Sequence, residues 1–381
     1  MIRTFQRELK LIFSDIAIVL TIFGGVVLYS FLYPQPYAKE SVSALAVSVV
    51  DLDRSEFSRD IIYKLNATPQ VDVIRHDMSA KDAKEALTCG LIKAIVVIPA
   101  HLQRDLALHI SPTIAIGADS SYFLIYGAVL EGAMKSVLTA SAKLKVANLL
   151  KSGVPIAGAK LEYTPFSLNT INLFNANNSY TQYVVPAVFV LILQQTLLIG
   201  LGILGGGDNE RRKKGLYTKE EQRDTWKIFL ARFFIFGVIF FVHLLFYFGF
   251  SYEMFGITHL AEVEDLLFLG LVFLLAVIAL GLLFGALLKG REIATPIILF
   301  SSLPLVFSVG FVWPLEAMPS FIHTLALFIP STPAIEAFLK LNQMGASLES
   351  VMESVKILLI QAFVYTSLAY YVHKRVYKPR S

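Results

Sequence analysis

Six long runs in this chain carry at most one Lys or Arg each and no acidic residue. A helix needs about 20 mostly apolar residues to cross roughly 30 Å of hydrocarbon, and each run is close to that length or longer. The runs are Ile16–Tyr33, Tyr183–Gly205, Ile228–Phe250, Leu266–Leu288, Ile293–Trp313 and Val355–Val372. With 55% hydrophobic residues and a mean hydropathy of +0.63, the chain has more apolar surface than one water-soluble core buries. The sequence therefore predicts an α-helical polytopic membrane protein with six transmembrane helices.

Positively charged residues lie beside alternate ends of these runs. The cytoplasmic flanks of membrane helices carry an excess of Lys and Arg. Such clusters precede the first run and follow the second, fourth and sixth runs, whereas the segment 251–265 has four acidic residues and no Lys or Arg. We therefore expect both termini to be cytoplasmic. The net charge of +4 reflects this bias and does not indicate nucleic acid binding.

Residues 34–182 have the composition of a soluble domain. They lie between the first predicted transmembrane segment, which is assigned to 15–33, and the second run. Short apolar stretches typical of strands alternate with capped amphipathic stretches typical of helices. Strands are expected at 45–50, 71–74, 92–98 and 113–118, and helices at 53–65, 79–88, 99–106 and 122–151. Asp53 is the expected N-cap of the first helix. The alternation predicts an α/β domain with a mostly parallel sheet, placed outside the membrane by the charge bias.

Residues 1–14 have the pattern of an amphipathic helix. Apolar side chains recur at helical spacing from Ile2 to Phe13, and Arg3 and Arg7 lie largely opposite. We expect this helix to lie at the cytoplasmic membrane surface. A basic flank that only fixes topology is the alternative.

Residues 183–381 contain the five later spans. Within this region, the segment 206–227 is the most charged part of the chain. It mixes both signs of charge with apolar side chains, which favours a protein partner over a lipid surface. The candidate contact residues for this partner are Glu210, Arg211, Arg212, Tyr217, Glu220, Arg223 and Trp226, together with Arg3 and Arg7 of the helix 1–14. A solvated cytoplasmic loop that only fixes topology is the alternative here as well.

Residues 314–345 hold two short helical stretches, and neither is long enough to cross the membrane. Irregular backbone at membrane depth is tolerated only where protein or a water-filled path surrounds it. We therefore expect re-entrant external helices that gate a substrate path. The candidate residues of the path or gate are Gly310, Trp313, Pro314, Glu316, Met318 and Pro319, together with the amides Gln194 and Gln195 of the second run. For the two amides, hydrogen bonding between helices is the expected role, and contact with the substrate is the alternative.

The sequence contains no phosphate-binding loop, no His-Glu-x-x-His and no Gly-x-Ser-x-Gly motif. Arg232 lies one turn inside the third run, where its side chain can extend to the cytoplasmic face. His243 lies deeper in this run, but none of the runs contains the carboxylate that a proton relay through it would need. We therefore expect neither an enzyme nor an ion-driven carrier, and no cofactor or metal bound by this chain.

Three stretches together resemble the ABC-2 type transporter permease family, in the branch with a large extracytoplasmic domain between the first two of six spans. Gly310-Phe-Val-Trp-Pro-Leu-Glu-Ala-Met-Pro319 is similar to an element that follows the family's fifth span. Phe174-Asn175 with Tyr183-Val-Val-Pro186 resembles the start of its second span, and Val49-Val-Asp-Leu-Asp-Arg-Ser55 resembles part of its external domain. In the loop after the second span, Glu210-Arg211 agree with the family, but its usual Gly-Thr-x-Glu and Thr-Pro elements are absent.

The resemblance implies the transmembrane subunit of an ABC exporter in a bacterial inner membrane. In that family, two permease subunits, identical or related, associate with two cytoplasmic ABC ATPase subunits that bind ATP and Mg²⁺, and the complex exports a hydrophobic or amphipathic compound. A periplasmic adaptor is a further candidate partner. The competing interpretation is a membrane-anchored receptor or assembly protein whose external domain binds a ligand or partner.

Overall fold

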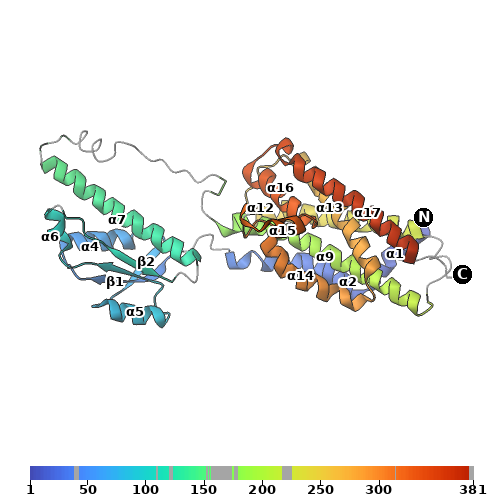
Figure 1. Ribbon diagram of the computed structural model, residues 1–381, viewed down its shortest axis with the longest axis horizontal. Coiled ribbons are helices and arrows are strands. Elements are labelled where there is room, and N and C mark those ends of the chain that lie inside the picture. The colour runs from blue at the N-terminus through green and yellow to red at the C-terminus, as the bar shows by residue number, and fades with distance from the viewer. Residues whose placement is uncertain are drawn as a thin grey trace. The chain divides into compact units, whose positions relative to one another are not determined.

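The chain forms two compact units, one of residues Ser41–Ile171 and one of Met1–Glu40 with Asn172–Ser381 (Figure 1). The computed structural model describes residues 1–37, 43–108, 110–119, 123–151, 153, 155, 174–175, 179–216, 225–313 and 315–376.

The smaller unit contains a four-stranded sheet in the order β2-β1-β3-β4. Its strands are β1 (Leu45–Asp51), β2 (Val71–His76), β3 (Ala94–Ile98) and β4 (Ala115–Ala118). Strand β1 is parallel to both of its neighbours, and β4 is antiparallel to β3. The predicted strands and the mostly parallel sheet are thus confirmed.

Helices cover both faces of this sheet, because successive residues of its strands point to opposite sides. The helices are α4 (Glu56–Asn66), α5 (Ala80–Thr88), α6 (Leu102–Ala107) and α7 (Phe123–Lys151). Val47 and Val49 of β1 belong to a core shared with α4 and α7, whereas Val50 packs with Ala83 of α5. The prediction of an α/β unit therefore holds at the level of its core.

The N-cap of α4 is Ser55, and the prediction of Asp53 was wrong. The Ser55 hydroxyl oxygen accepts the backbone N–H of Ser58 at 3.1 Å. Asp51, at the end of β1, accepts the N–H groups of Asp53 and Arg54 at 3.0 and 2.9 Å. This turn occupies the residues that the sequence pattern assigned to the cap, so the helix begins later.

The larger unit consists of helices, six of which are long and apolar enough to cross a membrane among the residues described, or up to seven if a bent pair counts as one span. The candidate spans are Ile16–Tyr37, Thr181–Lys213, Trp226–Met254, Val263–Leu287, Arg291–Ser308 and Leu348–Arg375. Their main helices are α2 (Ile16–Val19) and α3 (Val26–Leu32) joined by a π-helical turn, α9 (Tyr180–Lys213), α11 (Thr225–Leu245), α13 (Val263–Leu287), α14 (Ala294–Ser308) and α17 (Met352–Val376). The predicted number of spans is confirmed.

The residues that the structure describes in this unit form four other α-helices: α1 (Ile2–Ser14), α12 (Tyr252–Met254), α15 (Ser320–Ala326) and α16 (Ser331–Met344). Figure 1 shows α1 and the last turns of α9 and α17 at one end of the unit, with α12, α15 and α16 toward the other. The fifth span is shorter than predicted, because α14 ends at Ser308 and the residues up to Trp313 are not helical.

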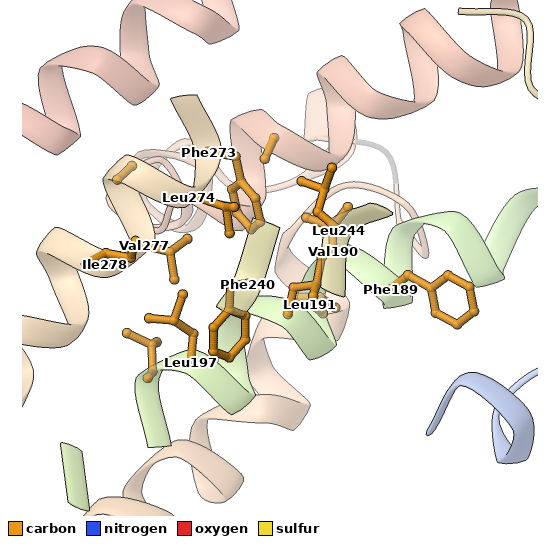
Figure 2. Packing of buried hydrophobic residues seen from close by; sticks show 14 of the residues in the cluster. Phe189, Val190, Leu191, Leu197, Phe240, Leu244, Phe273, Leu274, Val277 and Ile278 are labelled. Atoms are coloured by element: carbon orange, nitrogen blue, oxygen red, sulfur yellow. The ribbon is translucent and has the colours of Figure 1, made fainter. Parts of the chain in front are cut away.

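Helix α9 is the centre of the bundle. Of its most apolar 18-residue segment, 94% is buried inside the protein. Figure 2 shows Leu191 and Leu197 of α9 packed with Phe240 of α11 and with Phe273 and Val277 of α13. Every other span therefore has to be placed against α9 or against a helix that already covers it.

Helix α9 also continues eight residues past the predicted end of its span at Gly205, so the predicted loop 206–227 is too long. Gly205 and Gly206 in this stretch serve close packing. A Cβ on Gly205 would lie 2.5 Å from the backbone carbonyl carbon of Gly285 in α13. Small residues allow membrane helices to approach this closely, and here they let α9 and α13 continue side by side.

Candidate functional site

A buried ion network joins α1 to the ends of two membrane spans. Arg232 of α11 donates from Nε to Oε2 of Glu8 in α1 at 2.7 Å and from Nη2 to Oδ2 of Asp208 in α9 at 2.6 Å. The exposed fractions are 2% for Arg232, 0% for Glu8 and 4% for Asp208. Arg232 was predicted to extend to the cytoplasmic face, but its side chain is buried inside the protein and pairs with two carboxylates.

Two more arginines surround this network. Arg7 donates to Oε1 of Glu8 at 2.6 Å, and a nitrogen of Arg211 lies 3.6 Å from Oδ1 of Asp208. Removing a charge from water is costly unless it is paired and hydrogen-bonded. Here each carboxylate has two cationic neighbours, so the network is held together as a unit, and α1 cannot leave the bundle without exposing or stranding Glu8.

The environment also determines the charge state of Glu8. Burial acts to raise the pKa of this carboxyl, but the Arg232 charge and the hydrogen bonds from Arg7 and Arg232 outweigh it and hold the pKa below its ordinary value of 4.5. Glu8 is therefore ionised at neutral pH.

Helix α1 presents two different faces. Glu8 and Ile12 are buried against the bundle, with Phe5 partly buried beside them, whereas Ile2 and Phe13 are 77% and 52% exposed. The single apolar face predicted for this helix is thus divided. One part packs on protein and includes an acidic residue, and the other is free to face the membrane.

The last turns of α9 also hold the turn between α13 and α14. Asn209 donates from Nδ2 to the carbonyl oxygens of Ala286 and Leu288 at 3.1 and 2.8 Å, which caps the C-terminus of α13. Glu210 accepts the backbone N–H of Arg291 at 2.8 Å. The Arg291 side chain donates to Asp15, the N-cap of α2, at 2.7 Å. Polar contacts thus link five of the six spans at this end.

The residues predicted to contact an ATPase subunit are divided by these contacts. Glu210 and Arg211 are engaged inside the protein, and Trp226 stacks on Phe229 at a ring distance of 5.5 Å, edge-on to Tyr370. Arg3 is exposed on α1, and Arg212 lies in the last turn of α9. Tyr217, Glu220 and Arg223 lie outside the described residues.

At the other end, α15 and α16 meet at a corner of 87°, in the region where two short helices were predicted. Side chains from two spans hold the backbone of this corner. Gln194 of α9 accepts the N–H of Ser331 at 2.8 Å, and Gln361 of α17 donates to the carbonyl of Leu327 at 2.6 Å. Tyr365 donates to the carbonyl of Phe328. The predicted hydrogen-bonding role of Gln194 between helices is confirmed.

A groove of about 720 Å³ runs between α14 and α15, and its walls include Trp313, Met318 and Pro319. Gln195 accepts the Ser302 hydroxyl at 2.6 Å and so fixes α14 to α9. Gly310 has φ +94, a conformation that side chains disfavour, and a Cβ there would also collide with Leu315. Pro314 and the side chain of Glu316 lie outside the described residues.

Sequence reasoning missed Glu8 and Asp208. A signal for Glu8 was present, because Phe5, Glu8 and Ile12 share one helical face and an acid on such a face needs a buried cation. Asp208 lies three residues past Gly205, in the segment that was predicted to be a loop. Only the close packing of Gly205 on α13 shows that the helix continues and brings Asp208 to Arg232.

The fold and this site are those of a multi-pass membrane protein whose N-terminal helix is ion-paired to its spans. The family model described as "ABC-2 family transporter protein" matches residues 16–371. The chain therefore belongs to the ABC-2 transporter family, whose permeases have no nucleotide-binding domain of their own and work with an ABC ATPase subunit. A comparison with individually curated proteins finds no match.

Proposed function

We propose that this chain is the permease subunit of an ABC exporter that moves a hydrophobic or amphipathic compound out of the cytoplasm or the inner leaflet. Two copies, or this chain and a related one, would assemble with two ATPase subunits, which bind ATP and Mg²⁺. The observation that carries the proposal is the buried ion pair between Glu8 of α1 and Arg232 of α11. Because of this ion pair, a force that a partner applies to the exposed side of α1 would act directly on the spans.

The orientation that supports this proposal places α1 in the cytoplasm of a bacterial cell, with the bundle in the inner membrane. Helix α1 and the last turn of α17 lie at the same end of the helical unit (Figure 1). They contain Arg3, Lys10 and Arg375, as expected of a cytoplasmic face. The segment before α13 carries acidic residues instead, Glu253 in α12 and Glu262 at the N-cap of α13. The α/β unit is then extracytoplasmic, where an adaptor could reach it.

Helix α9 supplies a rigid path through the bundle. Its 34 residues correspond to about 51 Å. Asp208 lies near its cytoplasmic end and Gln194 fourteen residues earlier, or about 21 Å along the axis. A displacement of the ion network would thus be transmitted to the corner between α15 and α16, which is the proposed external gate.

Exposed and buried residues of α1 should give different phenotypes in the test. The chain would be co-expressed with a candidate ATP-binding cassette subunit from the same genome, and co-purification, ATP hydrolysis and transport in vesicles would be measured. Arg3→Glu with Lys10→Glu should weaken co-purification, because both side chains are exposed. Glu8→Gln should retain the ATPase but uncouple hydrolysis from transport.

The matched control is Lys81→Glu with Lys84→Glu, the same change of charge on exposed residues of α5. It should affect neither co-purification nor coupling. If the α1 double variant binds and couples as well as the unmodified protein, α1 is not the contact with the ATPase and the proposal fails in this form.

A further inference from the structure

The α/β unit has an apolar groove between α7, α4, α6 and the segment that leads into β4. Its volume is about 680 Å³, within the range typical of small-molecule sites. Among the residues that the structure describes, the polar lining consists of Lys145 and the hydroxyls of Ser111, Thr113 and Ser141, and the other lining residues are apolar. This α7 groove therefore has the size of a ligand site and walls made mainly of hydrocarbon.

The walls of the α7 groove are exposed, whereas its floor is part of the core. Ile110, Met134 and Leu138 line the groove and are 54%, 51% and 59% exposed. Ile61 and Leu102 also line it, and they are 2% and 1% exposed because they belong to the core of the unit. A cluster of exposed apolar side chains is a mark of binding grooves. Here the groove is built on a fixed floor, so a ligand finds it already formed.

Helix α7 gives the groove a direction. Met134, Leu138, Ser141 and Lys145 all line it, and their spacings of four, three and four residues place them in one stripe along the helix. The stripe is about 16 Å long. It begins with two apolar side chains and ends with a hydroxyl and an ammonium group. This order matches a ligand with an apolar chain and a polar head.

The charge at the polar end favours an anionic head. The Lys145 ammonium and the Ser141 hydroxyl are both hydrogen-bond donors, which suits the oxygens of a carboxylate or a phosphate. An adjoining hollow contains Glu56, Asp60 and Lys143, and Asp60 lies 3.6 Å from the Lys143 ammonium. Its two carboxylates would repel an anion that moved past Lys145. The head should therefore stay at this lysine, with the chain lying back along the stripe.

The geometry points to a binding site in the α/β unit for a single-chain amphipathic anion, whose head contacts Lys145 and Ser141 and whose chain lies in the α7 groove against Leu138 and Met134. The inference goes beyond the proposed function. Binding to this unit requires neither an ATPase nor transport, so the two ideas can fail separately.

The test is photo-crosslinking of the full-length permease in phosphatidylcholine nanodiscs. Three probes carry the same dodecyl chain with a terminal diazirine and differ in the head group, which is a carboxylate, an alcohol or a trimethylammonium. Mass spectrometry locates the labelled peptides, and labelling of the membrane spans corrects for partition of each probe into the bilayer. The carboxylate probe should label peptides from 102–118 and 123–151 saturably, at about threefold lower concentration than the alcohol. The trimethylammonium probe should label them least.

Two lysines of α7 form a matched pair of variants. Lys145→Gln should remove the preference for the carboxylate probe over the alcohol and leave labelling by the alcohol unchanged. Lys135→Gln makes the same change of charge at a position outside the groove lining, where the side chain pairs with Glu131. It should change neither probe.

Leu138→Glu tests the apolar part of the groove. The new carboxylate would meet both the chain and the anionic head, so labelling by the carboxylate probe should fall at least about tenfold. Because Leu138 is more than half exposed, the melting temperature should not change.

Three outcomes would overturn the proposal. The first is the absence of saturable labelling in 102–118 and 123–151. The second is labelling of these segments by the alcohol or the trimethylammonium probe as strongly as by the carboxylate. The third is an equal effect of Lys145→Gln and Lys135→Gln, which would reduce the role of Lys145 to the net charge of the unit. Carboxylate-selective labelling in a permease that binds no ATPase would support this site and overturn only the proposed function.

Discussion

Arg232 neutralises two carboxylates in a place that water does not reach, and this makes it the most sensitive residue of the cytoplasmic end. Arg232→Met would leave Glu8 and Asp208 buried without their main partner. Breaking a buried pair in this way costs about 3–5 kcal/mol. We expect the free energy of unfolding, measured by denaturation in mixed micelles, to fall by that amount.

Two further variants test whether this loss of unfolding free energy comes from the buried carboxylates that are left without a cation. Adding Glu8→Leu and Asp208→Leu to Arg232→Met removes all three charges and should recover most of the loss, since apolar replacements of whole buried networks are often neutral. Lys135→Met breaks an exposed pair with Glu131 in α7 and should change stability by less than about 1 kcal/mol. A larger loss in the triple variant than in Arg232→Met would contradict this account.

Glu8 should also give the network a defined pH dependence. The arginines hold the pKa of Glu8 below 4.5 in the folded protein despite its burial. A lowered folded-state pKa adds stability that is fully present above the unfolded-state value and is lost as pH falls through the folded-state value. The difference in unfolding free energy between the unmodified protein and Glu8→Gln should be constant from about pH 8 to 5.5 and shrink below about pH 4.5.

At the scale of helices and strands, hydrophobic periodicity was sufficient to predict an element wherever no second interaction changed its ends. The strands from β1 to β4 and the helices between them follow alternating and helical patterns, and the structure has them close to the expected residues. The errors lie where two rules compete. Ser55 is the cap instead of Asp53 because Asp51 forms a turn with the backbone at Asp53 and Arg54, and α9 continues past Gly205 because the backbone of α13 packs against this glycine.

Tertiary contacts also decided which predicted site residues are available to a partner. Glu210 and Arg211 have the composition of a docking surface, but their partners are Arg291 and Asp208 of the same chain. The pairing of Glu8 with Arg232 spans more than two hundred residues. No local pattern contains such a contact, so the sequence could suggest the region but not the arrangement.

The crossing of α9 and α13 provides a sharp test at the level of helices. Gly205→Ala would place a methyl group within 2.5 Å of the α13 backbone, so the two helices must separate. We expect a loss of at least about 2 kcal/mol in stability, because overpacking a tight contact typically costs about 1–3 kcal/mol. Thermal unfolding followed by intrinsic fluorescence would measure it.

The neighbouring Gly207 is the control for this crossing. It lies in the same helix, and nothing would lie within 4 Å of a Cβ there. Gly207→Ala should therefore be neutral or stabilise the protein by up to about 1 kcal/mol through helix propensity. Equal effects of the two substitutions would show that backbone entropy, not contact with α13, determines the result at Gly205.

The topology of the whole molecule can be tested with the natural sequence. Cys89 is the only cysteine of the chain, and it is exposed at the C-cap of α5 in the α/β unit. If this unit is extracytoplasmic, as the distribution of Lys and Arg predicts, an impermeant maleimide added to intact cells should label the unmodified protein.

The complementary variant, Cys89→Ser with Leu216→Cys, places an exposed thiol just after α9. It should react only after the membrane is permeabilised. One span, Ile16–Tyr37, separates α1 from the α/β unit, so α1 and Cys89 must lie on opposite sides of the membrane. The opposite labelling pattern would therefore place α1 outside the cell and exclude it as the contact for a cytoplasmic ATPase.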